Sequence, residues 1–183
     1  MTTQPTHAPP LPTSRDALYA FFNAHNIKFE TKEHAPVFTV EESAEIKARM
    51  PGGHTKNLFL KDKAGQVFLI CAQSDTQIKV NKLHPVLGCK RLSFGKPELL
   101  WEHLGVLPGS VTLFSLINDT QGVVKLVIDA RLQTHTIVNF HPLQNTATTA
   151  ISAEDMIKFA KATGHDPLIL DFSTLSATLG LSE

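Results

Sequence analysis

The stretch that decides the fold runs from residue 52 to residue 63 and reads Gly52-Gly53-His54-Thr55-Lys56-Asn57-Leu58-Phe59-Leu60-Lys61-Asp62-Lys63. Its two glycines tolerate backbone angles that other residues disfavour, and they let a ligand or another backbone approach closely. Polar residues 54–57 follow, and the apolar residues 58–60 then predict a buried strand that ends in the turn sequence 62–65. A polar cluster held between flexible glycines and a rigid strand is a common way to build a site.

The segments around this stretch predict a mixture of helices and strands. Thr13 or Ser14 caps the first expected helix, Thr39 and Glu42 form a capping box, and Ser152 with Asp155 caps the last long helix. Helices are expected over residues 14–26, 39–49, the second half of 75–87, 97–104 and 152–164. Strands are expected over residues 27–34, 57–61, 67–73, 89–93, 111–117, 123–129, 136–140, 145–151 and 168–172. Hairpin connections predict an α+β domain around a largely antiparallel or mixed sheet.

Composition places the chain among ordinary globular proteins. Its 183 residues suffice for one domain, with 42% apolar and 19% charged residues. Residues 1–13 are rich in proline and are expected to be a disordered tail, and residues beyond 172 a polar tail. No apolar run approaches the roughly 20 residues of a membrane span, and no secretory signal opens the chain. With Cys71 and Cys89 as its only cysteines, a reducing, cytoplasmic location is expected.

Positive charge gathers in the middle of a chain whose net charge is zero. Residues 56–96 hold eight basic and two acidic side chains, a local charge of +6. Such a segment can bind a polyanion at one place, while the neutral net charge does not favour nonspecific binding to DNA. DNA is therefore not an expected partner. The alternative is an ordinary solvated face of lysines.

Common catalytic motifs are missing from the sequence. It contains no phosphate-binding loop, no dinucleotide fingerprint, no serine-hydrolase elbow and no paired cysteine or histidine metal motif. Each of the nine histidines alone is more typical of a structural or surface residue than of a metal ligand. Three polar groups remain, at residues 54–57, 108–112 and 141–145, beside Gly or Pro. They predict either the rim of a pocket or ordinary turns.

Several ordered motifs resemble the YbaK/prolyl-tRNA editing family. The resemblance spans residues 14–172 and is carried by residues 34–42, 52–62, 91–94, 104–112, 117–119 and 141–149. It includes the runs Gly-Gly-His-Thr-Lys-Asn, Gly-Val-Leu-Pro-Gly-Ser and His-Pro-Leu-Gln-Asn-Thr-Ala. Two positions depart from the family pattern, Leu113 where many relatives have proline and Gly95 where alanine is common. Within the family, the chain is most similar to the free-standing prolyl-tRNA editing proteins.

The resemblance implies a single editing domain over residues 14–183, with a mixed, barrel-like sheet surrounded by helices. It implies a trans-editing deacylase that hydrolyses the ester of mischarged proline tRNA, with alanyl-proline-tRNA as the expected substrate and with no metal or cofactor. A cysteinyl- or seryl-tRNA deacylase of the same fold, and a non-catalytic tRNA- or synthetase-binding module, are the alternatives. Prolyl-tRNA synthetase is a further candidate partner, and no membrane partner is expected.

The same resemblance assigns roles to residues. Lys56 is expected to face the terminal phosphate or the developing oxyanion, and the backbone N–H groups of Gly109 and Ser110 to contribute further oxyanion contacts. The substrate pocket is expected to involve His54, Thr55, Asn57, Gly105, Pro108, His141, Pro142 and Asn145. The basic segment 56–96, and not the resemblance, supplies the expected tRNA contacts, which are Lys61, Lys63, Lys79, Lys82, Lys90 and Arg91. Because an ester is already activated, positioning water and stabilising an oxyanion can suffice for hydrolysis.

Overall fold

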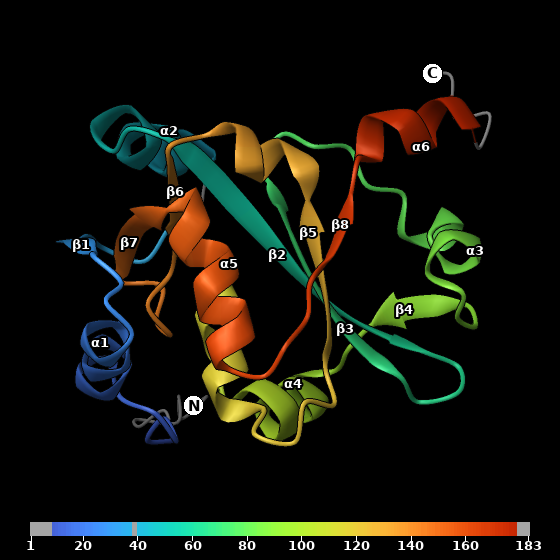
Figure 1. Cartoon of the computed structure of the whole chain (residues 1–183), viewed down its shortest axis with the longest axis horizontal. Coiled ribbons are helices and arrows are strands. Elements are labelled where there is room, and N and C mark those ends of the chain that lie inside the picture. Colours follow the sequence, from blue (N-terminus) through green and yellow to red (C-terminus); the bar gives the residue numbers. More distant parts are fainter. Residues whose placement is uncertain (1–8, 38–39, 179–183) are drawn as a thin grey trace, which may run out of the picture.

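The computed structural model describes residues 9–37 and 40–178. Within them, eight strands form one mixed sheet in the order β1-β7-β6-β2-β3-β5-β8, with β4 pairing beside β2 (Figure 1). The strands are β1 (Glu30–Glu33), β2 (Gly53–Asp62), β3 (Val67–Gln73), β4 (Leu92–Phe94), β5 (Lys125–Asp129), β6 (Ile137–Phe140), β7 (Ala147–Ser152) and β8 (Leu168–Leu170). This arrangement confirms the predicted α+β class with a mixed sheet.

Helices and short 3-10 segments surround the sheet. The helices are α1 (Arg15–Ala24), α2 (Val40–Arg49), α3 (His84–Leu87), α4 (Pro97–Leu104), α5 (Ala153–Ala162) and α6 (Phe172–Thr178). The 3-10 segments are η1 (Val80–Lys82), η2 (Leu113–Asn118) and η3 (Ala130–Thr134). No helix in these two described ranges is long and apolar enough to cross a bilayer.

Strand β2 is the long diagonal of the molecule and has three partners (Figure 1). It pairs antiparallel with β3 over residues 55–61, as the predicted hairpin requires. Along its other edge it pairs parallel with β6 at residues 53–54 and antiparallel with β4 at residues 60–62. The decisive stretch of sequence therefore occupies the centre of the sheet.

Alternation along β2 divides the apolar side chains between two cores. Phe59 faces the larger core, where helix and loop residues surround an aromatic cluster. That aromatic cluster consists of Phe22, Phe114, Phe140 and Phe159. Leu60 faces the smaller core on the opposite side, together with Phe172 of α6. Because successive strand residues point to opposite faces, the polar residues at the start of β2 also alternate between its two faces.

Two helix boundaries follow their sequence signals. The Ser152 hydroxyl accepts a hydrogen bond from the Asp155 amide at 3.0 Å and begins α5, as predicted. Gly105 ends α4 in a left-handed conformation with φ 60°, as predicted for a C-terminal glycine. A side chain at Gly105 would lie against Pro12 and Asn118, so this glycine also permits close packing.

The strand was predicted to begin at Asn57, with residues 54–56 before it, and that boundary is wrong. β2 begins at Gly53, because residues 53–54 pair with β6 and residues 55–57 pair with β3. The polar residues are therefore part of the regular strand, and they alternate between its two faces.

Three further element predictions are corrected. Residues 113–118 form the 3-10 segment η2 instead of a strand, because the apolar side chains are buried all around and Thr112 caps Phe114 N–H. Residues 172–178 form α6, where a polar tail was expected, because Phe172 packs into the smaller core. The expected helix within residues 75–87 is divided into η1 and the four-residue α3.

The N-terminal segment that the structure describes lies against the domain. Leu11 packs on the larger core, and the Thr13 hydroxyl donates to Asn118 Oδ1 at 2.5 Å. Residues 1–8, most of the predicted tail, lie outside the described residues. Thr39, the first residue of the predicted capping box, lies outside them as well.

Candidate active site

A small pocket lies where α2 approaches the beginning of β2 and the end of β6. Its volume is ≈ 190 Å³. It joins three of the predicted substrate-binding residues, His54, Thr55 and His141, which come from two motifs far apart in the sequence. The remaining lining residues are Val37, Ser43, Ile46, Lys47, Asn139, Phe140 and Thr148. We call this the α2 pocket.

Hydrogen bonds hold the polar groups of the α2 pocket in place. The Thr55 hydroxyl donates to the Asn139 carbonyl at 2.7 Å. His54 Nε2 lies 3.0 Å from the Met50 carbonyl, and His141 Nδ1 lies 2.9 Å from the Ala147 carbonyl. A carbonyl oxygen only accepts, so both of these ring nitrogens carry hydrogen. His54 Nδ1 and His141 Nε2 are consequently the lone-pair nitrogens of the two neutral rings.

Both pocket histidines favour the neutral form. Burial lowers the pKa of His54, against a raising effect of the Met50 hydrogen bond, and the Lys47 charge lowers it further. Burial also lowers the pKa of His141, against the Ala147 hydrogen bond, with an additional lowering effect from His34. The two rings are thus suited to accept hydrogen bonds near neutral pH and poorly suited to act as cations.

Acidification should destabilise the protein through these two histidines. Their pKa values lie below the usual 6.5, so the unfolded chain binds protons first as pH falls through that value. The free energy of unfolding, measured by urea titration, is expected to be lower at pH 5.5 than at pH 7.5. His141→Gln should reduce this difference, since glutamine does not titrate. A variant that retained the full pH dependence would exclude His141 as a contributor.

Ser110 and Asn145 lie together in a neighbouring pocket of ≈ 180 Å³, beside Leu107 and Leu143. Gly109 adjoins them, since a side chain there would lie 3.7 Å from Asn145 Nδ2. The Ser110 N–H donates to the Leu107 carbonyl at 3.0 Å. This amide is therefore occupied by a turn and not free to bind an oxyanion in this conformation.

The loop between β6 and β7 borders both pockets. His141 lines the α2 pocket, and Leu143, two residues later, lines the neighbouring one. Leu143 has a positive φ of 69°, which is strained for a bulky side chain, yet it is 1% exposed. Burial of this leucine therefore holds the loop that carries His141 and Asn145. Pro142 is buried in the same loop, and Pro108 is exposed.

Lys56 lies on the opposite face of β2 from Thr55 and does not line the α2 pocket. Its ammonium group donates to the Thr76 carbonyl. Arg131 Nη1 donates to the Thr76 hydroxyl at 3.0 Å, so two cationic side chains converge on one residue. The buried Asp129 carboxylate accepts from the same hydroxyl at 2.5 Å and anchors it.

Asn57 shares a face of β2 with Thr55, deeper in the sheet. Its Nδ2 donates to the Thr55 hydroxyl at 3.3 Å, and its Oδ1 is buried without a hydrogen bond to any described residue. It does not line the α2 pocket. Gly105, the remaining predicted pocket residue, ends α4 and packs against Pro12.

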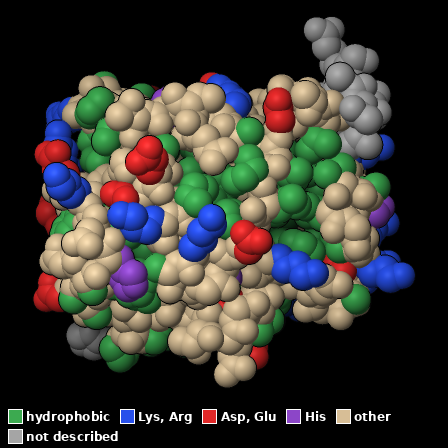
Figure 2. All heavy atoms as spheres, in the orientation of Figure 1, with side chains coloured by type: hydrophobic (Ala, Val, Ile, Leu, Met, Phe, Trp, Pro, Cys, Tyr) green, Lys and Arg blue, Asp and Glu red, His purple; other side chains and the backbone are tan. Residues whose placement is uncertain are grey.

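Of the predicted tRNA contacts, Lys61, Lys63, Lys90 and Arg91 lie at the end of β2 that is remote from the α2 pocket, and Lys79 and Lys82 lie at the two ends of η1. Five of them are exposed and Lys61 is half-buried; the exposed ones are Lys63, Lys79, Lys82, Lys90 and Arg91. Figure 2, in the orientation of Figure 1, shows lysine and arginine side chains along the right-hand side, near α3 and β4, and others on the left. Charge is therefore distributed over the surface and is not confined to one patch.

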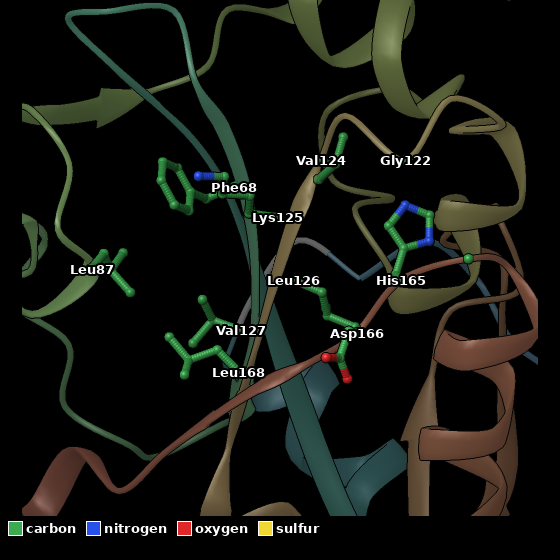
Figure 3. A pocket seen from close by; sticks show the side chains of 11 residues that line it. Phe68, Leu87, Gly122, Val124, Lys125, Leu126, Val127, His165, Asp166 and Leu168 are labelled. Carbon is green, nitrogen blue, oxygen red and sulfur yellow. The ribbon is translucent and has the colours of Figure 1, made fainter.

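A third pocket, of ≈ 270 Å³, contains none of the predicted site residues (Figure 3). Phe68, Leu87 and Val127 contribute apolar walls to it. Both ring nitrogens of His165 are engaged, by Asp119 Oδ2 at 2.7 Å and by the Thr163 hydroxyl at 3.0 Å. The imidazole thus has a structural role, which makes this pocket a weaker candidate than the α2 pocket.

Sequence reasoning did not single out Arg131 or Asn139. Arg131 falls in a segment interpreted as a connection, and nothing in the sequence indicates its contact with Thr76. Asn139 carries a signal that could have been used, because it is a polar residue inside the apolar strand 136–140. Over residues 9–37 and 40–178, no group of three His, Cys, Asp or Glu side chains could hold a metal ion.

Comparisons with known proteins agree on one family. The profile described as "Aminoacyl-tRNA editing domain" matches residues 34–159. The chain is 39% identical to the zebrafish (Danio rerio) "Prolyl-tRNA synthetase associated domain-containing protein 1", over 86% of this chain and 87% of the relative. It is 34% identical to the "Prolyl-tRNA editing protein ProX" of Acetoanaerobium sticklandii, over 83% and 93% of the two chains.

A solved structure shares the fold at low sequence identity. It is the crystal structure of a "putative trans-editing enzyme for prolyl tRNA synthetase", which superposes with a TM-score of 0.66. The two sequences are 17% identical, and the superposition covers 88% of this chain and 98% of the other. This likeness establishes the architecture alone.

Proposed function

Because the chain belongs to the aminoacyl-tRNA editing domain family, we propose that it hydrolyses the ester of mischarged proline tRNA, with alanine as the amino acid removed. The observation that supports this most is the α2 pocket. It is small, ≈ 190 Å³, and it joins His54 and Thr55 of one motif to His141 of another. A pocket of this size favours a small side chain and rejects larger ones by steric clash.

In the proposed reaction, the α2 pocket holds the aminoacyl group and a water molecule attacks its ester carbon. His141 Nε2 is a lone-pair acceptor that can orient the water or the neighbouring ribose hydroxyl. The N–H of Gly109 is the remaining candidate from the glycine loop for stabilising the oxyanion, since the Ser110 amide is engaged. No covalent intermediate is required, because the ester is already activated.

Lys56 is proposed to bind the phosphate of the terminal nucleotide, with Arg131 beside it. Of the two roles expected for Lys56, phosphate binding fits its position better, because its side chain leaves the opposite face of β2. The guanidinium group of Arg131 adds a second cation at Thr76, and a phosphate can accept from both. β2 is about 30 Å long, so lysines near its far end could contact the acceptor stem.

Lys56→Ala is expected to slow hydrolysis of alanyl-proline-tRNA roughly tenfold to a hundredfold, the usual effect of losing a charge-assisted hydrogen bond. The loss should appear mainly in KM if Lys56 binds a phosphate that does not change during the reaction. Steady-state deacylation of labelled tRNA measures both constants. Lys158→Ala, which removes an exposed lysine on α5, is the control and should retain wild-type rates.

Unchanged rates in Lys56→Ala would remove this lysine from the mechanism. A wild-type protein that cleaves none of the alanyl, seryl and cysteinyl esters would contradict the deacylase proposal itself. Salt-sensitive tRNA binding without hydrolysis would then favour the non-catalytic tRNA- or synthetase-binding alternative. Preference for the seryl or cysteinyl ester would retain the enzyme and change its substrate.

A further inference from the structure

Asn139 forms part of the floor of the α2 pocket, where its side chain is 2% exposed. Its Nδ2 donates to the Pro51 carbonyl at 3.1 Å and to the Gly53 carbonyl at 3.2 Å. Both amide hydrogens are therefore used. Its Oδ1 accepts no hydrogen bond from any residue that the structure describes.

The two carbonyl partners determine how the amide is oriented. Carbonyl oxygens cannot donate, so the NH₂ group must face Pro51 and Gly53, and the oxygen must face away from them. A buried acceptor without a donor costs free energy, and a ligand that supplies the donor recovers it. The side-chain oxygen Oδ1 of Asn139 can therefore still accept a hydrogen bond from a ligand.

Three other polar side chains of the α2 pocket, His54, Thr55 and His141, already donate their hydrogens to backbone carbonyls. The hydrogens on His54 Nε2 and His141 Nδ1 are committed to the carbonyls of Met50 and Ala147. The Thr55 hydroxyl is committed to the Asn139 carbonyl. Two imidazole lone pairs and one amide oxygen therefore remain, beside the hydroxyl groups of Ser43 and Thr148 and the ammonium group of Lys47. The three acceptors suit a ligand that carries several donors. A primary ammonium group has three.

We propose that Asn139 is a specificity-determining residue whose Oδ1 accepts a hydrogen bond from the α-ammonium group of the aminoacyl ester. This inference rests on the proposed deacylase function and deepens it, because it names the part of the substrate that the pocket floor recognises. The site then selects esters with a free amino group.

Two substrates and one variant test this proposal. Alanyl-proline-tRNA is compared with propionyl-proline-tRNA, which lacks only the amino group. Each kcat/KM is divided by the spontaneous rate of hydrolysis, because the ammonium group itself activates the ester. The wild type should prefer the alanyl ester roughly tenfold to a hundredfold, as expected for a hydrogen bond to a charged group. Asn139→Ala should lose most of that preference.

The ratio separates recognition from a purely structural role. Loss of the bonds to Pro51 and Gly53, or partial unfolding, would lower both rates by the same factor and leave the ratio unchanged. Asn139→Asp is the matched control, because it also lacks the amide hydrogens but keeps an acceptor; it should retain the alanyl preference.

Three results have distinct meanings. An equal preference in the wild type and Asn139→Ala would overturn the role of Asn139. If the wild type hydrolysed both esters at the same normalised rate, that measurement alone would overturn the proposed role of Asn139. A wild type that hydrolyses neither ester would contradict the proposed function instead.

Discussion

Replacing Phe114 by alanine should lower the free energy of unfolding by about 3–5 kcal/mol, the usual cost of removing a buried aromatic side chain. Phe114 is fully buried, and its ring centroid lies 5.0 Å from that of Phe22 and 5.4 Å from that of Phe140. A further edge contact, at 5.3 Å, reaches Phe159 of α5. The substitution would therefore leave a cavity among three rings that come from different parts of the chain.

Phe94→Ala is the matched control for this substitution. Phe94 is 61% exposed at the end of β4, so its removal should change the free energy of unfolding by about 0.5 kcal/mol or less. Urea or guanidinium titration of the two variants and the wild type measures the difference. Equal losses for Phe114 and Phe94 would contradict the core described for this fold.

Gly52→Ala should destabilise the protein by about 2–5 kcal/mol, through backbone strain and overpacking together. Gly52 has φ 101°, a conformation that L residues rarely adopt. A side-chain carbon added there would lie 2.4 Å from the Ile137 carbonyl oxygen, which belongs to β6. Either β6 or the start of β2 must move, so hydrolysis should decrease as well.

Gly65→Ala separates the two contributions. Gly65, in the β2–β3 hairpin, has a similar φ of 90°, but an added carbon would meet nothing within 4 Å. Only the backbone strain remains, so a loss of about 1–2 kcal/mol is expected. Denaturant midpoints with unchanged slopes would establish the comparison. A loss at Gly65 as large as that at Gly52 would show that the contact with Ile137 contributes nothing.

Local signals were sufficient for much of the fold. The Ser152 hydroxyl, Gly105 and the turn at residues 62–65 mark boundaries that depend mainly on the neighbouring residues. Residues 113–118 were misassigned for a physical reason. A short apolar run without periodicity is compatible with a strand or a buried helical turn, and the surrounding core determines which one forms.

The candidate site was harder to predict, because the side chains of residues 54–56 alternate between two faces only if these residues belong to β2. With the strand starting at residue 57, Lys56 and Thr55 appeared to share one polar cluster. With the strand starting at Gly53, they lie on opposite faces. Parallel pairing of His54 with Asn139 then brings the start of β2 to the end of β6, where His141 follows. That pairing spans more than 80 residues of sequence, and no local pattern encodes it.

The pairing between β2 and β6 also has a mechanical consequence. Only Gly53↔Val138 and His54↔Asn139 pair there, whereas seven residue pairs join β2 to β3. The sheet therefore consists of two firmly paired halves, β1-β7-β6 and β2-β3-β5-β8, connected along a short seam. A rotation of one half against the other would be concentrated at this seam. The α2 pocket has walls from both halves, so such a rotation would change its width.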